Sequence, residues 1–237
     1  MNQQPFDYAT IPVGYYDRVF ASQAGVQSKW HHLKFERMRA AIAGCRRHLD
    51  IGCSAGTFIG TLAPGQDSVG IDLAEAQIDY ARQHHGGPNR RFEVVPAGPL
   101  PYADGAFDAV TVVELIEHLP AADNLVLLRE AARVLEHGGR LVVSTPNYGS
   151  LWPVLEGLVN RLGEVDYSDQ HITHYTRSSL AALMAEAGLR DVRVEGYLFA
   201  APFAAALDWG LADRVDRLEP RFLTDRLGFL LIATGTK

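Results

Sequence analysis

Apolar and polar residues alternate between the period of a strand and the period of a helix along the first part of the chain. Short apolar runs bounded by turn residues are separated by segments whose apolar positions lie three or four residues apart. Such alternation is typical of a parallel sheet whose strands are joined by right-handed helical crossovers. The predicted strands are 47–51, 68–71, 92–95, 107–113 and 140–144, and the predicted helices are 56–62, 74–85 and a stretch from 114 to 135 interrupted at Pro120.

Three segments depart from this alternation. Residues 15–43 have apolar side chains at helical spacing among charged ones, which predicts a helical cap before the first strand. Residues 147–175 are rich in aromatic residues and lack a regular period, as is typical of a lid over an active site. Beyond the lid, the pattern predicts a helix at 178–187, a strand at 189–195, an apolar helical stretch at 199–211 and a last strand at 228–233.

Together these elements predict an α/β fold. We expect a doubly wound, seven-stranded, mostly parallel, Rossmann-like sheet with a terminal antiparallel strand. A chain of 237 residues with 47% hydrophobic content can bury one sizeable core, so we expect one α/β domain with additions. We divide the chain into an N-terminal helical cap (1–45) and a main domain (46–237) with an inserted lid at about 147–175.

Composition narrows the range of partners. The net charge is −6 and no cluster of Lys or Arg could follow a phosphate backbone, so we expect no nucleic acid and a small-molecule partner instead. Cys45 and Cys53 match neither a disulfide framework nor a zinc site. No run reaches the roughly 20 apolar residues that a membrane span needs, so we expect no stable membrane insertion. Because residues 1–10 lack the pattern of a signal peptide, we expect a cytoplasmic location.

A glycine-rich turn follows the first predicted strand. The segment Gly52-Cys53-Ser54-Ala55-Gly56 separates that strand from a helix and exposes backbone N–H groups to a polar ligand. Asp72 stands twenty residues beyond Gly52, at the end of the next strand, where its carboxylate can accept hydrogen bonds from both hydroxyls of a ribose. The two features together predict a ligand that contains a nucleoside.

Two other site types share parts of this pattern. A dinucleotide site would need a third glycine where the chain has Thr57, so NAD is disfavoured. The same letters satisfy G-x-S-x-G, the nucleophile elbow of a serine hydrolase, but that interpretation leaves Asp72 without a role. The hydrolase would use Ser54 as nucleophile, His171 or His174 as base and Asp166 or Asp169 as the acid that orients the base.

Four motifs in order resemble those of class I S-adenosylmethionine (SAM)-dependent methyltransferases. Residues 49–58 resemble the first motif, 69–73 the ribose-binding segment, 100–108 the adenine loop with the fourth strand, and 133–139 the entry to the fifth strand. The resemblance implies SAM as cofactor and S-adenosylhomocysteine as product. It implies cofactor contacts from Asp50, Gly52, Cys53, Ser54, Gly56, Asp72, Leu73, Ala97, Gly98 and Glu114.

The sequence departs from the family pattern at two places. Ser54 stands where the first motif usually has its middle glycine, which narrows the space over the methionine moiety. The segment Pro96-Ala97-Gly98-Pro99 stands where relatives commonly have an acidic residue for the adenine amino group. We therefore expect backbone and apolar contacts to hold the adenine.

Catalytic candidates follow the fourth predicted strand. Glu114, Glu117 and His118 have the spacing of one helical face and resemble the E-x-x-E-H of ubiquinone-pathway O-methyltransferases. This spacing is compatible with a divalent metal that acidifies a catechol-like hydroxyl, but we favour a site without metal. In the favoured interpretation Glu114 shapes the cofactor pocket and His118 is the base.

The end of the lid supplies further candidates. His171 is a second candidate base, although it and His174 have the alternative role of capping the helix that begins near residue 177. The expected function is transfer of a methyl group to an O or N atom of a small molecule, as in small-molecule biosynthesis. A C- or lipid-directed methyltransferase and a cofactor-binding protein without catalysis remain alternatives. Candidate substrate contacts are Tyr16, Trp30, His174 and Tyr175.

The apolar stretch 197–209 has two interpretations. It is compatible with a buried helix or with a wall of an apolar acceptor pocket. Because it contains Asp208 and no basic residue, the pattern argues against a helix that lies on a membrane surface.

Overall fold

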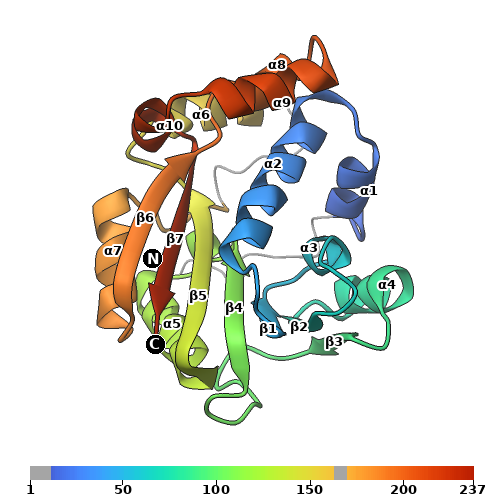
Figure 1. The fold of residues 1–237 in the computed structure, drawn as a ribbon, viewed down its shortest axis with the longest axis vertical. Helices are drawn as coiled ribbons and strands as arrows, with labels where there is room; N and C mark the ends of the chain where they lie inside the picture. The colour runs from blue at the N-terminus through green and yellow to red at the C-terminus, as the bar shows by residue number, and fades with distance from the viewer. Residues whose placement is uncertain (1–11, 163–169) are drawn as a thin grey trace.

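The computed structural model describes residues 12–162 and 170–237. Its centre is a seven-stranded sheet in the order β3-β2-β1-β4-β5-β7-β6 (Figure 1). Strands β1 to β5 are paired in parallel, and β7 is antiparallel to both β5 and β6. The strands are β1 Arg47–Ile51, β2 Asp67–Asp72, β3 Arg90–Val94, β4 Phe107–Val113, β5 Leu135–Pro146, β6 Arg190–Tyr197 and β7 Leu230–Thr236. The predicted sheet and its antiparallel strand are confirmed.

Helices cover both faces of the sheet. On one face, α5 and α7 bury Leu128, Leu180 and Met184 against the strands. On the other, α2, α3 and α4 bury a second cluster that includes Met38 and Ile78. The helices are α1 Tyr15–Ala21, α2 Gly25–Ala41, α3 Thr57–Gly60, α4 Glu75–His85, a short 3-10 helix Ile116–His118, α5 Ala121–Val134, α6 Trp152–Leu162, α7 Arg177–Glu186, α8 Ala201–Ala204, α9 Trp209–Leu218 and α10 Arg221–Leu227.

Local backbone geometry divides two predicted helices. The predicted cap helix is two helices, α1 and α2, because Gln23 and Gly25 have positive φ angles of 48° and 72°. The predicted helical stretch 199–211 is likewise divided into α8 and α9. The Asp208 carboxylate accepts a hydrogen bond from the Leu211 N–H and starts α9 there. In the described part of the lid, α6 is a helix that the sequence pattern did not predict, and Asp166 and Asp169 lie outside the described residues.

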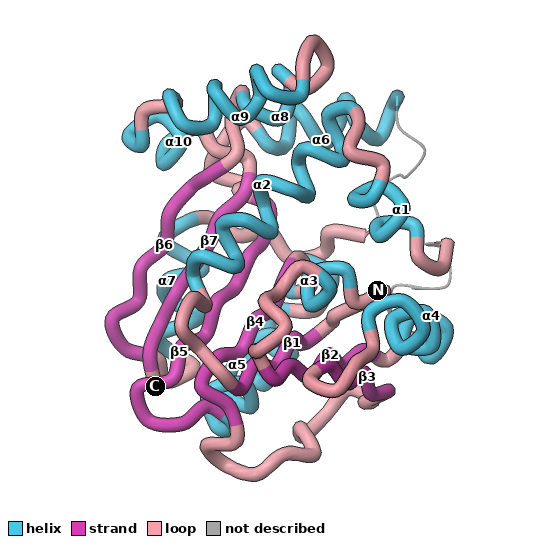
Figure 2. The backbone as a smooth tube through the Cα atoms, turned by 45° about the vertical axis from the view of Figure 1, so that its right-hand side comes forward, coloured by secondary structure: helices cyan, strands magenta, loops and turns pink. Residues whose placement is uncertain are grey.

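The strand order determines where a ligand can bind. The order reverses between β1 and β4, because the connections leave β1 on one side and β4 on the other. In doubly wound sheets, ligands bind at the carboxyl ends of the strands beside this reversal. Figure 2 shows α1, α2 and α3 close to this edge of the sheet. Among the described residues, no helix is both long enough and apolar enough to cross a membrane.

Candidate functional site

A cavity of about 740 Å³ lies at the carboxyl edge of β1, β2 and β4. Its walls come from the glycine turn, the end of β4, α2, and the lid helix α6. Residues from distant parts of the sequence therefore line one cavity. Of the residues expected from the sequence, the cavity is lined by Asp50, Gly52, Cys53, Ser54, Asp72, Glu114, His118 and His171, and by the aromatic residues Tyr16 and Trp30.

The glycine turn is held against β2 by its backbone. The N–H groups of Gly52 and Cys53 both donate hydrogen bonds to the carbonyl of Ile71, at 2.8 and 3.0 Å. Gly52 has a φ of 76°, and a Cβ there would lie 2.8 Å from the Leu115 side chain. A glycine is therefore required at this position for both backbone conformation and space.

Asp72 is fixed at the end of β2 by backbone donors. Its two carboxylate oxygens accept hydrogen bonds from the N–H groups of Ser54 and Ala74, each at 2.9 Å. Burial raises the pKa of Asp72, and these backbone hydrogen bonds oppose the rise. Because each carboxylate oxygen has two acceptor sites, Asp72 can still accept hydrogen bonds from two ribose hydroxyls.

Asp50 lies at the cavity end of a buried series of polar side chains. The Thr111 hydroxyl donates to the Asp50 carboxylate at 2.5 Å, so the His48 Nε2–H donates to Thr111 at 2.8 Å. The hydroxyl of Ser68 lies 3.4 Å from the other ring nitrogen of His48. Burial raises the pKa of Asp50 to about 7 and lowers that of His48 to about 3. The series therefore orients the Asp50 carboxyl group, which has a high proton affinity, at the edge of the cavity.

The Thr111 hydroxyl provides a test of this polar series. We expect Thr111→Val to lower the free energy of unfolding by about 2–4 kcal/mol, because it leaves buried groups on Asp50 and His48 without a partner. The control Thr111→Ser keeps the hydroxyl and should cost about 1 kcal/mol. Urea unfolding followed by circular dichroism measures both variants. A Thr111→Val variant as stable as Thr111→Ser would contradict the predicted role.

Glu114 combines unusual backbone geometry with an unsatisfied acceptor. Its φ is 50°, which is rare for a residue other than glycine. One carboxylate oxygen forms an ion pair with Lys34 Nζ at 2.5 Å, while Oε1 is buried without a hydrogen-bond partner among the described residues. Such an atom calls for a donor from a ligand, because an unsatisfied buried acceptor is unfavourable. The Glu114–Lys34 pair thus offers an acceptor for an ammonium and a cation for a carboxylate.

Two histidines lie together at the end of the site where α6 lines the cavity. The ring centroids of His118 and His171 are 5.0 Å apart. The His118 Nδ1–H donates to the carbonyl of Gln170 at 2.9 Å, and His171 Nδ1 forms a hydrogen bond with the Glu156 carboxylate of α6. Burial lowers the pKa of His118 to about 4, with a further contribution from His171, and burial also lowers the pKa of His171. Both imidazoles are therefore neutral at pH 7.

Glu117 lies beside the two histidines. It is buried and accepts a hydrogen bond from the Thr145 hydroxyl at 2.9 Å. Burial and the neighbouring Glu114 carboxylate raise its pKa to about 8. One ligand atom from each of Glu117, His118 and His171 lies within 4.8 Å of the others, which is compatible with a metal ion. The sequence spacing grouped Glu114, Glu117 and His118 as possible metal ligands. In the structure, the group with suitable spacing is Glu117, His118 and His171.

Other expected site residues do not line the cavity. Leu73 is half exposed, Ala97 and Gly98 are exposed, and Gly56 starts α3 behind the turn. His174 stacks on Tyr148 with ring centroids 3.8 Å apart, and the buried Tyr175 hydroxyl accepts a hydrogen bond from Asn124. The cap of α7 is Thr176, whose side chain accepts from the Ser179 N–H. The roles expected for these residues stay predictions.

Sequence patterns missed three polar residues of the site. Lys34 lies on α2, whose charged residues look like an ordinary solvated face, yet its side chain is buried. Glu156 and Tyr148 come from the lid, and the Tyr148 hydroxyl donates to Glu156 at 2.9 Å. Only the folding of α2 and α6 over the sheet brings Lys34 to the cavity and Glu156 to His171. In contrast, no described histidine forms a hydrogen bond with Ser54, as a nucleophile elbow would require.

Comparison with known proteins agrees with this geometry. Residues 49–143 match the model of a family described as "Methyltransferase domain". The chain is 32% identical over 160 residues to a ubiquinone biosynthesis O-methyltransferase of Bordetella avium, covering 64% of this chain and 65% of that protein. It is 31% identical to the Xanthomonas euvesicatoria enzyme of the same name, covering 70% of this chain and 72% of that protein.

A solved structure shows the same fold. It is a SAM-dependent methyltransferase from Thermotoga maritima, described as a possible histamine N-methyltransferase, with a TM-score of 0.65 at 20% identity over 94% of both proteins. The chain belongs to the class I SAM-dependent methyltransferases. The matched regions span only 35% to 65% of the length of several curated relatives.

The cavity also fits SAM, the cofactor of this family. SAM has two positive groups, an ammonium and a sulfonium, and the cavity is lined by the carboxyl groups of Asp50, Asp72, Glu114 and Glu117. The unsatisfied Glu114 Oε1 would accept a hydrogen bond from the ammonium, and Lys34 would pair with the methionine carboxylate. The Asp72 carboxylate, which already accepts two backbone hydrogen bonds, keeps acceptor sites that would suit the ribose hydroxyls.

Proposed function

We propose that this protein transfers the methyl group of SAM to an oxygen or nitrogen atom of a small-molecule acceptor. The observation that carries the proposal is a single cavity lined both by the glycine turn with Asp72 and by the His118–His171 pair. SAM supplies an electrophilic methyl group on its sulfonium. The protein then has to hold the acceptor in line with that methyl and remove a proton from the acceptor. The names of the Bordetella and Xanthomonas relatives favour an oxygen acceptor.

The proposed base is His171, with His118 as the second candidate. The Glu156 carboxylate accepts the Nδ1–H of His171, and this hydrogen bond favours the tautomer whose Nε2 can take a proton. Glu156 is therefore a positioning residue for the base. Tyr148 donates to the same carboxylate and limits its rotation. Tyr16 and Trp30, which line the cavity from α1 and α2, are proposed to contact the acceptor.

The function is tested with isotopically labelled SAM. We expect labelled methyl to be transferred to at least one member of a panel of phenols, catechols and aliphatic and aromatic amines. Mass spectrometry and NMR of the product assign the methylated atom, and a methyl on carbon would support the C-methyltransferase alternative. Binding of S-adenosylhomocysteine without turnover across the panel would support a binding protein without catalysis. Labelling of Ser54 by a fluorophosphonate probe would instead support the hydrolase.

Metal dependence is tested in the same assay. We expect turnover to be unchanged after dialysis against EDTA, because the histidine–carboxylate contacts already provide a neutral base without metal. The alternative is a metal ion on Glu117, His118 and His171, which would acidify the acceptor hydroxyl. A loss of turnover that Mg²⁺ or Mn²⁺ restores would support this alternative.

A further inference from the structure

The connection between β6 and β7 is much longer than their pairing requires. The two strands are antiparallel neighbours whose last paired residues are Tyr197 and Leu230, and a turn of a few residues can join such strands. Instead, residues 198–229 form α8, α9 and α10. Figures 1 and 2 show these helices as a layer at one end of the molecule, with the C-terminus at the other end. These helices therefore form a surface that is not required for joining β6 to β7.

The inner side of this layer is attached to α2 by ion pairs. Asp213 of α9 lies 2.9 Å from Lys29 Nζ, and Asp216 lies 3.0 Å from an Arg37 guanidinium nitrogen. Ala212 of the same helix is buried. The acidic residues of α9 are therefore turned toward the protein, and the opposite side of the helix faces outward.

The outer side of the layer is apolar. The exposed fractions of Leu207, Leu218 and Phe222 are 84%, 80% and 75%, and Leu211 is also exposed. Leu211 and Leu218 are separated by two helical turns and lie on one side of α9. Exposed apolar side chains that gather on one surface indicate an interaction site.

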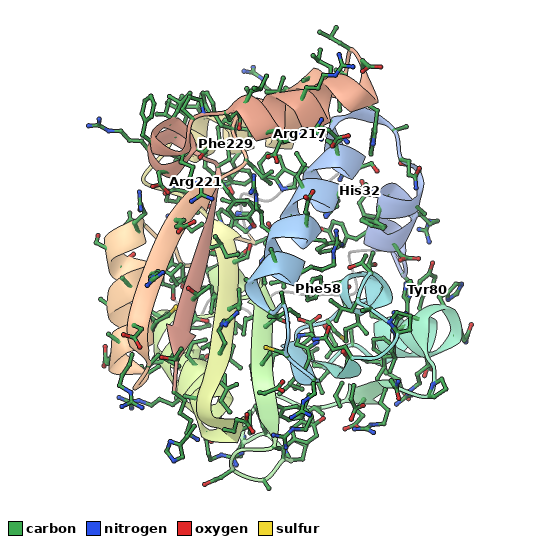
Figure 3. The ribbon with its side chains drawn as sticks, in the orientation of Figure 1. His32, Phe58, Tyr80, Arg217, Arg221 and Phe229 are labelled. Atoms are coloured by element: carbon green, nitrogen blue, oxygen red, sulfur yellow. The ribbon has the colours of Figure 1, made fainter. Side chains whose placement is uncertain are left out.

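The same surface has an excess of unpaired positive charge. All five acidic residues of the segment have partners within the protein, since Asp208, Glu219 and Asp225 accept backbone hydrogen bonds and the other two form the ion pairs described above. None of its four arginine side chains has an ion pair or hydrogen bond with another described residue, and all four are exposed. They are Arg214, Arg217, Arg221 and Arg226. Figure 3 shows Arg217 and Arg221 at this end of the molecule.

Leucine and phenylalanine beside unpaired arginines are the composition of a helix that lies at the interface of an anionic membrane. We propose that the α8–α10 surface, formed by the outward residues of 207–226, binds the surface of a bilayer that contains anionic lipids. The apolar side chains enter the boundary between headgroups and acyl chains, and the guanidinium groups contact the lipid phosphates. The arginines lie on α9 and α10, beyond the stretch 197–209 whose lack of basic residues argued against such a helix. The positive surface occurs in a protein whose net charge is −6, so attraction to anions is local to this segment.

The test is co-sedimentation of the full-length protein with vesicles of phosphatidylcholine, with and without about 30% phosphatidylglycerol. We expect binding only to the anionic vesicles, and weaker binding as salt rises from about 50 to about 500 mM. Combining Arg214→Gln, Arg217→Gln and Arg221→Gln should weaken binding about a hundredfold, at about fivefold for each arginine. Leu218→Gln with Phe222→Gln should weaken it at least about tenfold.

Matched controls keep the test specific. The combination Arg129→Gln, Arg190→Gln and Arg193→Gln removes the same charge from positions on α5 and β6, away from the α8–α10 surface, and it should leave vesicle binding unchanged. Calorimetry with S-adenosylhomocysteine verifies that every variant is folded.

Two outcomes would overturn the proposal. One is equal vesicle binding by the two arginine variants. The other is no binding to anionic vesicles at low salt, and a dimer in sedimentation velocity that Leu218→Gln with Phe222→Gln then dissociates would show that a second copy covers this surface.

Discussion

Replacing His171 by alanine should lower kcat for methyl transfer about a thousandfold, within the range that a general base contributes. The affinity for S-adenosylhomocysteine should change less than about threefold, because His171 lies among the lid residues and not in the glycine turn. The measurement is the rate of labelled methyl transfer to the best acceptor of the panel. The control is His174→Ala, which removes a neighbouring imidazole that does not line the cavity and should lower kcat only a few fold.

The pH profile separates a base from a structural role. Burial lowers the pKa of His171 below 6.5, so the imidazole is neutral at pH 7 and the rate should fall as pH drops below this lowered pKa. Glu156 opposes the lowering, because its carboxylate favours the imidazolium. Glu156→Gln should therefore move the acid limb of the profile to lower pH. Unchanged kcat in His171→Ala, together with a strong loss in His118→Ala, would transfer the role to His118.

Replacing Asp72 by alanine should weaken binding of S-adenosylhomocysteine about a hundredfold or more. The expected loss combines two hydrogen bonds from ribose hydroxyls to an ionised carboxylate, each of about 1.5–3 kcal/mol. The variant also removes the acceptor for the Ser54 and Ala74 N–H groups, so the turn becomes less well ordered. Isothermal titration calorimetry measures the dissociation constant directly.

The control for this variant lies on the same strand. Asp67→Ala removes a half-exposed carboxylate at the opposite end of β2, 3.9 Å from Arg91, and should leave affinity unchanged. Asp72→Asn keeps one acceptor oxygen without the charge and should bind with intermediate affinity. Wild-type affinity in Asp72→Ala would remove Asp72 from the cofactor site and contradict the assigned position of the ribose.

The glycine turn and Asp72 could be placed at one edge of the sheet from the sequence because both follow from local patterns. Gly56, Leu73, Ala97 and Gly98, which were also expected to contact the cofactor, do not line the cavity. The glycine turn occupies five consecutive positions. Its hydrogen bonds to β2 depend on the parallel pairing of β1 with β2, which is expected for strands joined by a helical crossover. The position of Asp72 at the end of β2 follows from the same alternation of strands and helices. Placing this carboxylate near the turn therefore needed no knowledge of side-chain packing.

The catalytic half depended on contacts that sequence spacing does not encode. On a continuous helix, Glu114, Glu117 and His118 would share one face, but Glu114 has a positive φ and only Ile116–His118 form a short 3-10 helix. Glu114 consequently pairs with Lys34 of α2, while Glu117 and His118 meet His171, which lies near the end of the segment 147–175. These pairings depend on how α2 and α6 pack over the sheet edge.

The sequence by itself determined the class of fold, the family and the position of the glycine turn beside Asp72, because periodicity and a contiguous motif specify local backbone geometry. The tertiary structure decided which polar groups meet: Lys34 with Glu114, Glu156 with His171, and the acids of α9 with α2. It also decided which side of α8–α10 faces outward. The physical reason is that burial and pairing of side chains depend on contacts between elements separated by many residues. The spacing of residues in the sequence does not specify those contacts.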